Sequence, residues 1–305
     1  MKLLVTGGTG LVGHALQKIK PDAIYVGSKD FDLTKESDVK KMFDKYQPTH
    51  LIHLAAKVGG IKDNIEHQAD FYYQNIMMNT LVLHYAYKYK VKKLLATISN
   101  CAYPDVAKKY PLLEEQLYDG PPAKTNFSYG LAKRMLDVQI KSYNMQYNCN
   151  FIGAIPCSIY GPYDEFSDGQ SHFLAALIKK IYNANKENKK ELQLFGTGKP
   201  LRQYIYSEDL AKIIIKLLNE YEGEQILNIA PKENLSIKEI AQIALKSTDS
   251  THLKLNFDSK FPDGQFRKDL GSHKLFNIIG NFEFTSLSVG IKKTYEWYKQ
   301  MDEVK

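Results

Sequence analysis

The chain has 305 residues, of which 44% are hydrophobic and 25% charged, so it has enough apolar material for a packed core and general disorder is excluded. Its net charge of +7 combines 41 basic with 34 acidic residues, a mild excess that suits an anionic ligand better than a nucleic acid. No window approaches about 18 apolar residues, so we expect no membrane-spanning helix. The N-terminal apolar run is too short for a signal peptide.

The N-terminal stretch predicts a dinucleotide-binding unit. An apolar strand at 2–6 is followed by Gly7, Gly10 and Gly13, and a helix continues through 14–19. Glycines with this GxxGxxG spacing let the backbone approach a pyrophosphate, whose charge the helix N-terminus favours. The alternative is a glycine turn needed only for packing of the helix on the strand.

Strands and helices then alternate along the first half of the chain. Strands are predicted at 23–26, 50–54, 93–99 and 151–155, and helices at 36–46, 70–90 and 129–147. Such alternation is typical of a doubly wound parallel sheet, so the predicted fold class is α/β of the Rossmann type.

Beyond Pro156 the pattern changes. Helices are predicted at 173–185 and 207–221, with Ser207 as a candidate cap, strands at 193–195, 203–206 and 225–229, and two more helices after Ser236 around a loop near 261–268. We therefore expect a Rossmann domain of residues 1–156 plus about 203–230. A smaller α/β substrate-binding lid would comprise about 157–202 plus 231–305.

Tyr129 and Lys133 form a YxxxK motif on a predicted helix, where residues four apart share one face. A tyrosine has an ordinary pKa of about 10, and a nearby ammonium is expected to lower that pKa. Such a pair can give a proton to a carbonyl oxygen while hydride reaches its carbon. The alternative is an ordinary surface turn of helix.

Ser99 ends the predicted strand at 93–99, and Cys101 follows two residues later. Positions two apart in an extended segment point the same way, so both side chains are expected at one site. Ser99 can hydrogen-bond the substrate oxygen held by Tyr129. The alternative for Cys101 is a small buried side chain.

With these motifs the sequence resembles the extended short-chain dehydrogenase/reductases and, within them, the GDP-L-fucose synthase family, which epimerises and reduces GDP-4-keto-6-deoxy-D-mannose. The resemblance runs nearly end to end. It rests on residues 54–61, 126–133, 160–166, 171–172, 196–202 and 263–268.

The resemblance implies catalytic roles. Ser99, Tyr129 and Lys133 would form the reductase triad, and Cys101 and His172 would be the acid–base pair for epimerisation at C3 and C5. A 4-keto group acidifies the protons on both adjacent carbons, and inversion needs one group to remove a proton and another to return it.

The cofactor is expected to be NADPH/NADP+. NAD enzymes usually place an acid after the second strand, whereas this chain has Ser28 and Lys29, which can receive a 2′-phosphate, although Asp30 follows directly. The resemblance also implies NADPH. The expected cofactor-binding residues are Gly7, Gly10, Leu11, Val12, Gly13, Ser28, Lys29, Asp32, Leu33, Leu54, Ala55, Ala56, Lys133 and Pro156.

A GDP-linked keto-sugar is the implied substrate. Arg202 and Lys268 match family positions that meet the diphosphate or its sugar, and Lys180 stands where an arginine is common; the alternative for each is a solvated cation. The expected substrate-binding residues are Lys57, Val58, Gly59, Cys157, Ser158, Lys180, Arg202 and Lys268.

The sequence departs from the family near the chemistry. Asn100 replaces a small hydroxyl residue, and Cys157 and Ser158 replace the Thr-Asn of a Pro-Thr-Asn segment, which leaves room for a larger sugar. One alternative is therefore a C4-reductase acting on a GDP-4-keto-heptose in bacterial capsule biosynthesis, with a separate epimerase. A 4-epimerase that retains NAD would not require both Cys101 and His172.

Two further expectations concern class and assembly. The intact triad argues against a non-catalytic dinucleotide sensor, and no nucleic-acid or metal-binding motif is present. The few cysteines, Cys101, Cys149 and Cys157, indicate a reducing, cytoplasmic location. The resemblance also implies a homodimer through helices 70–90 and 129–147. The aromatic residues expected to be exposed there are Phe71, Tyr72, Tyr73, Tyr85 and Tyr143, and the alternative for each is the internal core.

Overall fold

A computed structural model describes residues 1–261 and 263–303 of the protein. Its centre is a six-stranded parallel sheet with the strand order β10-β5-β4-β3-β1-β2. These strands are β1 (Leu3–Thr6), β2 (Ile24–Val26), β3 (His50–His53), β4 (Lys93–Thr97), β5 (Phe151–Pro156) and β10 (Leu227–Ile229). The predicted α/β class is confirmed.

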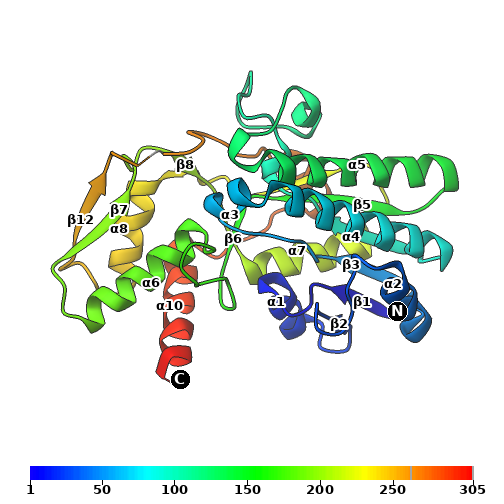
Figure 1. The fold of residues 1–305 in the computed structure, drawn as a ribbon, viewed down its shortest axis with the longest axis horizontal. Coiled ribbons are helices and arrows are strands. Elements are labelled where there is room, and N and C mark those ends of the chain that lie inside the picture. Colours follow the sequence, from blue (N-terminus) through cyan, green and yellow to red (C-terminus); the bar gives the residue numbers. More distant parts are fainter. Residues whose placement is uncertain (262, 304–305) are drawn as a thin grey trace.

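Helices cover both faces of this sheet (Figure 1). They are α1 (Leu11–Ile19), α2 (Glu36–Tyr46), α4 (Gln68–Lys88), α5 (Phe127–Tyr147) and α7 (Ser207–Glu220). Helices α4 and α5 lie side by side on one face with α2, and α1 and α7 pack together on the other. Because both faces are covered, β1, β4 and β5 are buried along their whole lengths, which explains their unbroken apolar runs.

A second, smaller body lies beside the sheet, at the left of Figure 1. It contains α6 (Phe173–Lys186), α8 (Ile237–Ser247) and α10 (Leu287–Glu303), with the parallel pair β7 (Glu191–Phe195) and β12 (Lys254–Asp258). Its apolar side chains form a buried cluster separate from that of the sheet.

The remaining elements are short. They are α3 (Ile61–Glu66), α9 (His273–Ile279), β6 (Ser158–Tyr160), β8 (Leu201–Arg202), β9 (Tyr204–Tyr206), β11 (Leu235–Ser236) and the 3-10 turns η1 (Asn100–Ala102), η2 (Glu114–Tyr118) and η3 (Lys124–Asn126). Strands β6 and β9 pair in parallel, and β8 and β11 antiparallel.

Several sequence expectations need correction. Three helices, not two, follow Ser236, and α3 was not predicted. Ser207 is the first residue of α7 rather than its cap, because Tyr206 holds the extended cap position. The predicted loop near 261–268 includes residue 262, and the predicted lid includes 304–305; these three residues lie outside the described part.

The region after 231 does not pack as one unit. Leu270, Leu275 and Ile279 belong to the buried cluster of the sheet, whereas Leu287 and Ile291 of α10 belong to the smaller one. We therefore propose that residues 270–279 belong with the Rossmann domain rather than with the lid expected at 231–305.

The aromatic residues of α4 divide between core and surface. Phe71 and Tyr85 are buried, which selects the core alternative for them; they pack toward Tyr129 and Phe43, respectively. Tyr72 and Tyr73 are exposed as expected. On α5, Tyr143 is half-buried, with its hydroxyl 2.8 Å from Nδ1 of His84. Within the described residues, no helix is sufficiently long and apolar to cross a bilayer.

Asn228 closes the outer edge of the sheet at β10. Its Oδ1 accepts from the Tyr103 hydroxyl at 2.8 Å, and its Nδ2 donates to the carbonyls of Leu112 and Gly271 at 3.0 and 3.1 Å. Its backbone N–H donates to Oε1 of Glu114 at 2.8 Å. One fully buried amide thus ties two distant segments to the edge strand.

We expect Asn228→Leu to lower the free energy of unfolding by roughly 3 kcal/mol, because it leaves the Tyr103 hydroxyl and the Gly271 carbonyl without these partners at about 1–3 kcal/mol each, whereas the Leu112 carbonyl still accepts from the Gly271 N–H. Urea unfolding followed by circular dichroism measures the change. Asn256→Leu on β12, which loses one exposed bond to Glu191, is the matched control and should cost less than about 1 kcal/mol. If both variants lose the same free energy of unfolding, the buried hydrogen bonds of Asn228 do not stabilise the edge of the sheet as described.

Candidate active site

The glycine turn between β1 and α1 forms a backbone cradle at the carboxyl edge of the sheet. Gly7 has φ +72°, and a Cβ there would lie 2.7 Å from the backbone nitrogen of Ala55. A Cβ on Gly13 would lie 2.5 Å from the Gly7 carbonyl. Only glycine fits at these two points, which brings the turn close to the end of β3.

Helix α1 presents an uncapped N-terminus to this cradle. Gly10 is its N-cap, Leu11 and Val12 are its first residues, and no side-chain cap or first-turn acid satisfies its N–H groups. Free N–H groups and the helix dipole favour a pyrophosphate here. Leu54 and Ala55 lie against Gly7, Ala56 follows them, and Pro156 ends the buried strand β5. The residues present therefore fit a dinucleotide.

The end of β2 carries the candidate 2′-phosphate residues. Ser28 and Lys29 are exposed. Asp30 turns its carboxylate to the chain, with Oδ2 accepting from the Gly27 N–H at 2.8 Å. Asp32 is engaged with Thr34 and Lys35, which hold the pKa of its carboxyl below the ordinary value, and Leu33 is buried. Asp30 is exposed like Ser28 and Lys29, but its carboxylate is already engaged by the backbone of the turn.

Lys133 is buried on α5 and donates from Nζ to the Thr97 carbonyl at 2.9 Å. Tyr129 lies one turn earlier, where Ser99 is near enough to act on the pKa of its hydroxyl, and its ring is in edge contact with the Phe71 ring at 6.2 Å. The structure thus brings the three expected members of the triad together at the end of β4.

The electrostatics of this group differ from expectation. Burial raises the pKa of Tyr129, the nearby Cys101 raises it further, and the Ser99 hydrogen bond opposes them. The net direction is therefore opposite to the predicted lowering, because burial is the largest cause and Lys133 is not among the groups that shift this pKa. Burial lowers the pKa of Lys133 to about 8, so it stays mostly charged at neutral pH. Tyr129 is therefore a neutral phenol, a proton donor.

A buried histidine lies beneath the triad. His53 contacts Thr6 Oγ1 through Nδ1 at 2.7 Å and Asn79 Oδ1 through Nε2 at 3.1 Å. Burial and the Lys133 charge lower its pKa to about 3, so it is neutral. Because an amide oxygen only accepts, Nε2 carries the proton. The ring adds no competing positive charge beside Lys133.

Cys101 lies in the η1 turn rather than in an extended strand, because β4 ends at Thr97 and Ser99 caps the turn. The Ser99 Oγ accepts from the Cys101 N–H at 3.2 Å. The thiol is 3.7 Å from Asn100 Oδ1 and 3.9 Å from Lys268 Nζ. Asn100, which departs from the family pattern, therefore contacts the thiol directly.

Lys268 links the second group of site residues. Its ammonium contacts Cys101. Burial of the ring lowers the pKa of His172, and the Lys268 charge lowers it further. Part of His172 is nevertheless accessible to solvent. The same ammonium opposes the effect of burial on Cys157, a buried thiol whose pKa burial raises. Arg202 interacts electrostatically with Cys101 and Asp263, and donates to the Leu201 carbonyl at 2.7 Å.

The remaining expected substrate residues lie on three separate elements. Lys57, Val58 and Gly59 follow β3, and Val58 is exposed. Ser158 starts β6 and pairs with Tyr204 of β9. Lys180 lies on α6, where it donates to the Gln193 carbonyl at 3.1 Å and lies 4.7 Å from the centre of the Phe195 ring.

Three supporting residues were not identified from the sequence. Asn75 on α4 accepts from the Lys57 N–H at 3.1 Å and donates to the Lys57 carbonyl at 3.0 Å, so one buried amide clamps that loop. Asp263 accepts from the Thr197 N–H and hydroxyl, both at 2.6 Å, and anchors the segment that carries Lys268. Asp164 is a carboxyl whose pKa burial raises to about 7. Asp164 and Asp263 lie in segments that match the family, 160–166 and 263–268, whereas no such signal marks Asn75.

Comparisons with known proteins agree with this geometry. Residues 3–230 match the NAD dependent epimerase/dehydratase family. A GDP-L-fucose synthase of Dictyostelium discoideum is 37% identical over 97% of this chain and 94% of its own length.

Two solved structures are also similar. A GDP-L-fucose synthetase from Naegleria fowleri bound to NADP superposes with a TM-score of 0.92 at 35% identity, covering 99% of this chain and 93% of its own. A GDP-6-OMe-4-keto-L-xylo-heptose reductase from C. jejuni superposes with a TM-score of 0.89 at 27% identity, covering 98% of both chains.

The raised pKa of Asp164 predicts a pH-dependent stability. Between its ordinary pKa and about 7 the folded protein binds a proton that the unfolded chain has released, so this stabilisation is lost as pH rises through 7. Asp164→Asn stays neutral, so its melting temperature should rise relative to wild type between pH 5 and 8. Calorimetry across that range measures the difference. Asp168→Asn, whose side chain is 94% exposed, is the control and should show no such trend. If the difference in melting temperature between Asp164→Asn and wild type does not change with pH, the pKa of Asp164 is not raised in the folded protein.

Proposed function

The chain belongs to the NAD dependent epimerase/dehydratase family, and from this membership we propose that it uses NADPH to reduce the 4-keto group of a GDP-4-keto-6-deoxy-sugar and epimerises the sugar at C3 and C5. The names of its relatives support the substrate class, and the NADP-bound neighbour supports the cofactor. The observation that carries the proposal is the Cys101 thiol, which lies beside the Ser99–Tyr129 pair and 3.9 Å from the ammonium that also acts on His172.

In the reductive step, Ser99 and Tyr129 hold the 4-keto oxygen. NADPH supplies the hydride to C4 when it is bound. Tyr129, kept neutral by burial, gives its proton to the oxygen as negative charge develops there. Lys133 holds α5, and with it the Tyr129 ring, in place through its bond to the Thr97 carbonyl.

In the epimerisation step, Cys101 and His172 exchange protons with the carbons next to the ketone. The ketone delocalises the charge left when a carbon loses its proton, and Ser99 and Tyr129 stabilise that charge at the oxygen. The lowered pKa of His172 keeps the ring neutral near pH 7, ready to take a proton. Arg202 and Lys268 hold the diphosphate or the sugar and so fix which carbon faces the thiol.

The two steps can be separated by isotope exchange. In heavy water with GDP-4-keto-6-deoxy-D-mannose and NADPH, we expect NADPH oxidation and deuterium at both C3 and C5 by NMR. Tyr129→Phe should slow NADPH oxidation by about 10²-fold or more, because it removes the proton donor of the reduction, and should slow exchange less, because Ser99 still stabilises the charge at the oxygen. Cys101→Ser should stop exchange.

Cys149→Ser, a change at a half-buried cysteine beside the start of β5, is the control and should leave both rates unchanged. Reduction by the wild-type protein without deuterium in the product would refute the epimerase half.

The second candidate function is C4 reduction of a GDP-4-keto-heptose for a capsule or other surface polysaccharide, with a separate epimerase. The small side chains Cys157 and Ser158 and the similarity to a heptose reductase favour it. Turnover of the heptose but not of the hexose in the same assay would select this alternative.

We further propose a homodimer in which α4 and α5 of two copies form a four-helix interface. The two helices lie side by side and expose large apolar side chains: Tyr72, Tyr73, Val138, Met145 and Tyr147. Exposed apolar side chains gathered on adjacent helices mark an association surface.

Sedimentation velocity should give twice the mass of the 34.9 kDa chain. Val138→Glu should shift the protein toward monomer, because it places a charge in the apolar contact. Val289→Glu on α10, at a similarly exposed valine, should remain dimeric. A monomeric wild-type protein, or an unchanged mass for Val138→Glu, would rule out this interface.

A further inference from the structure

Tyr163 joins the two bodies of the protein through its ring. It stacks on His14 of α1, with ring centres 3.8 Å apart and planes at 17°, and on its other side it meets Trp297 of α10 at 4.8 Å. His14 lies in the first turns of the helix that follows the glycine cradle. One ring therefore bridges the cofactor-side helix and the C-terminal helix of the smaller body.

The same segment is attached to α10 at a second point. Phe166 is buried and packs on Trp297 at 5.9 Å and on Tyr298 at 4.6 Å. Residues 161–172 then lead to His172, which is the N-cap of α6. The positions of Tyr163 and Phe166 thus limit where the His172 end of the segment can lie.

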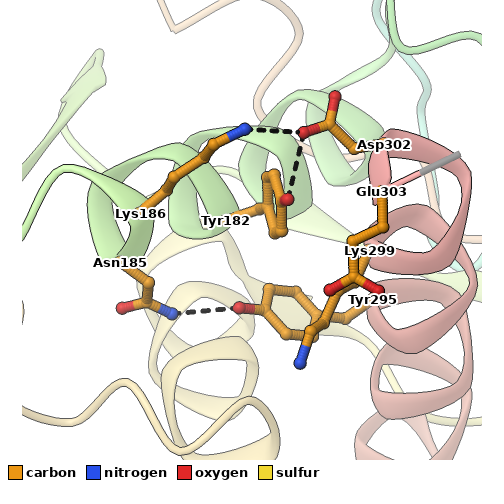
Figure 2. A pocket seen from close by; sticks show the side chains of 7 residues that line it. All are labelled: Tyr182, Asn185, Lys186, Tyr295, Lys299, Asp302 and Glu303. Carbon is orange, nitrogen blue, oxygen red and sulfur yellow. Dashed lines mark hydrogen bonds and ion pairs between the residues drawn. The ribbon is translucent and has the colours of Figure 1, made fainter. Parts of the chain in front are cut away.

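Helix α10 is a fixed support because it is tied to α6 (Figure 2). The Tyr182 hydroxyl donates to Asp302 at 3.0 Å, and Asn185 donates to the Tyr295 hydroxyl at 3.0 Å. His172 begins α6 and Trp297 lies on α10. The helix that His172 caps is therefore bonded to the helix on which Tyr163 and Phe166 pack.

The backbone at Tyr163 shows that these contacts are needed. Its φ is +67°, in the left-handed region that residues other than glycine, asparagine and aspartate seldom adopt. The side chain is 42% exposed, so burial alone does not explain an aromatic residue there. The stack on His14 and Trp297 is the interaction that holds this conformation.

We propose that Tyr163 is a positioning residue for epimerisation, which fixes His172 by locking residues 161–172 between α1 and α10. This inference rests on the proposed function, in which His172 exchanges a proton with the sugar. Proton transfer is sensitive to placement, and a shift of about 1 Å can cost about 10²-fold in rate. Reduction uses Ser99, Tyr129 and Lys133, which lie on other elements, so it depends less on Tyr163.

Tyr163→Gly is the sharpest variant, because glycine adopts the same backbone conformation without strain and only the ring is lost. Tyr163→Phe retains the stack. Tyr89→Ala is the control, since Tyr89 stacks on Tyr85 at the far end of α4 and faces α2.

The first measurement is acrylamide quenching of fluorescence from Trp297, the single tryptophan of the chain. Tyr163→Gly should raise the quenching constant, whereas Tyr163→Phe and Tyr89→Ala should not. The second measurement compares deuterium exchange at C3 and C5 with NADP+ against NADPH oxidation. Tyr163→Gly should lower the ratio of exchange to reduction by about tenfold or more, and Tyr163→Phe should restore it.

An unchanged ratio in Tyr163→Gly, with wild-type protein active in both assays, would overturn this inference and leave the proposed function intact. An equal loss of reduction and exchange would also overturn it, since Tyr163 would then support the whole active site rather than the position of His172. Absence of any turnover by the wild-type protein would overturn the proposed function and the role of Tyr163 with it.

Discussion

The hydrogen bond from the buried Lys133 ammonium to the Thr97 carbonyl sets how α5 lies on the central sheet. An ammonium group removed from water must keep a polar partner, so this contact cannot be exchanged for an apolar one without loss. Tyr129 lies one helical turn before Lys133, and Ser99 lies two residues after Thr97. This bond therefore joins the helix that supplies the phenol to the end of β4, just before the turn that supplies the Ser99 hydroxyl.

The parts of the fold that the sequence predicted well are those with local signals. The glycine spacing before α1, the apolar runs of the central strands and the four-residue spacing of Tyr129 and Lys133 each depend on residues close together in the chain. The α/β class and most elements of the first half followed from them. The grouping of Ser99 with Tyr129 and Lys133 followed from the resemblance to the family, since no local pattern joins a residue near 99 to a helix that begins near 127.

Features that depend on distant contacts could not be predicted. The aromatic residues of α4 point to several sides, so the sequence does not indicate that Phe71 and Tyr85 face protein while Tyr72 and Tyr73 face water. The direction of the Tyr129 pKa depends on how completely its surroundings exclude water. The Asn75 clamp joins positions 18 residues apart, and no short motif marks it.

The closed edge at β10 has a consequence for the behaviour of the protein at high concentration. An edge strand normally offers a row of free N–H and C=O groups to which a strand of another molecule can add. Here the outward N–H groups of Asn228 and Ala230 already donate to the side chains of Glu114 and Ser272, at 2.8 and 2.9 Å. These side chains take the place of a seventh strand and leave little for a foreign strand to pair with. The sheet is thereby protected against edge-to-edge aggregation on this side.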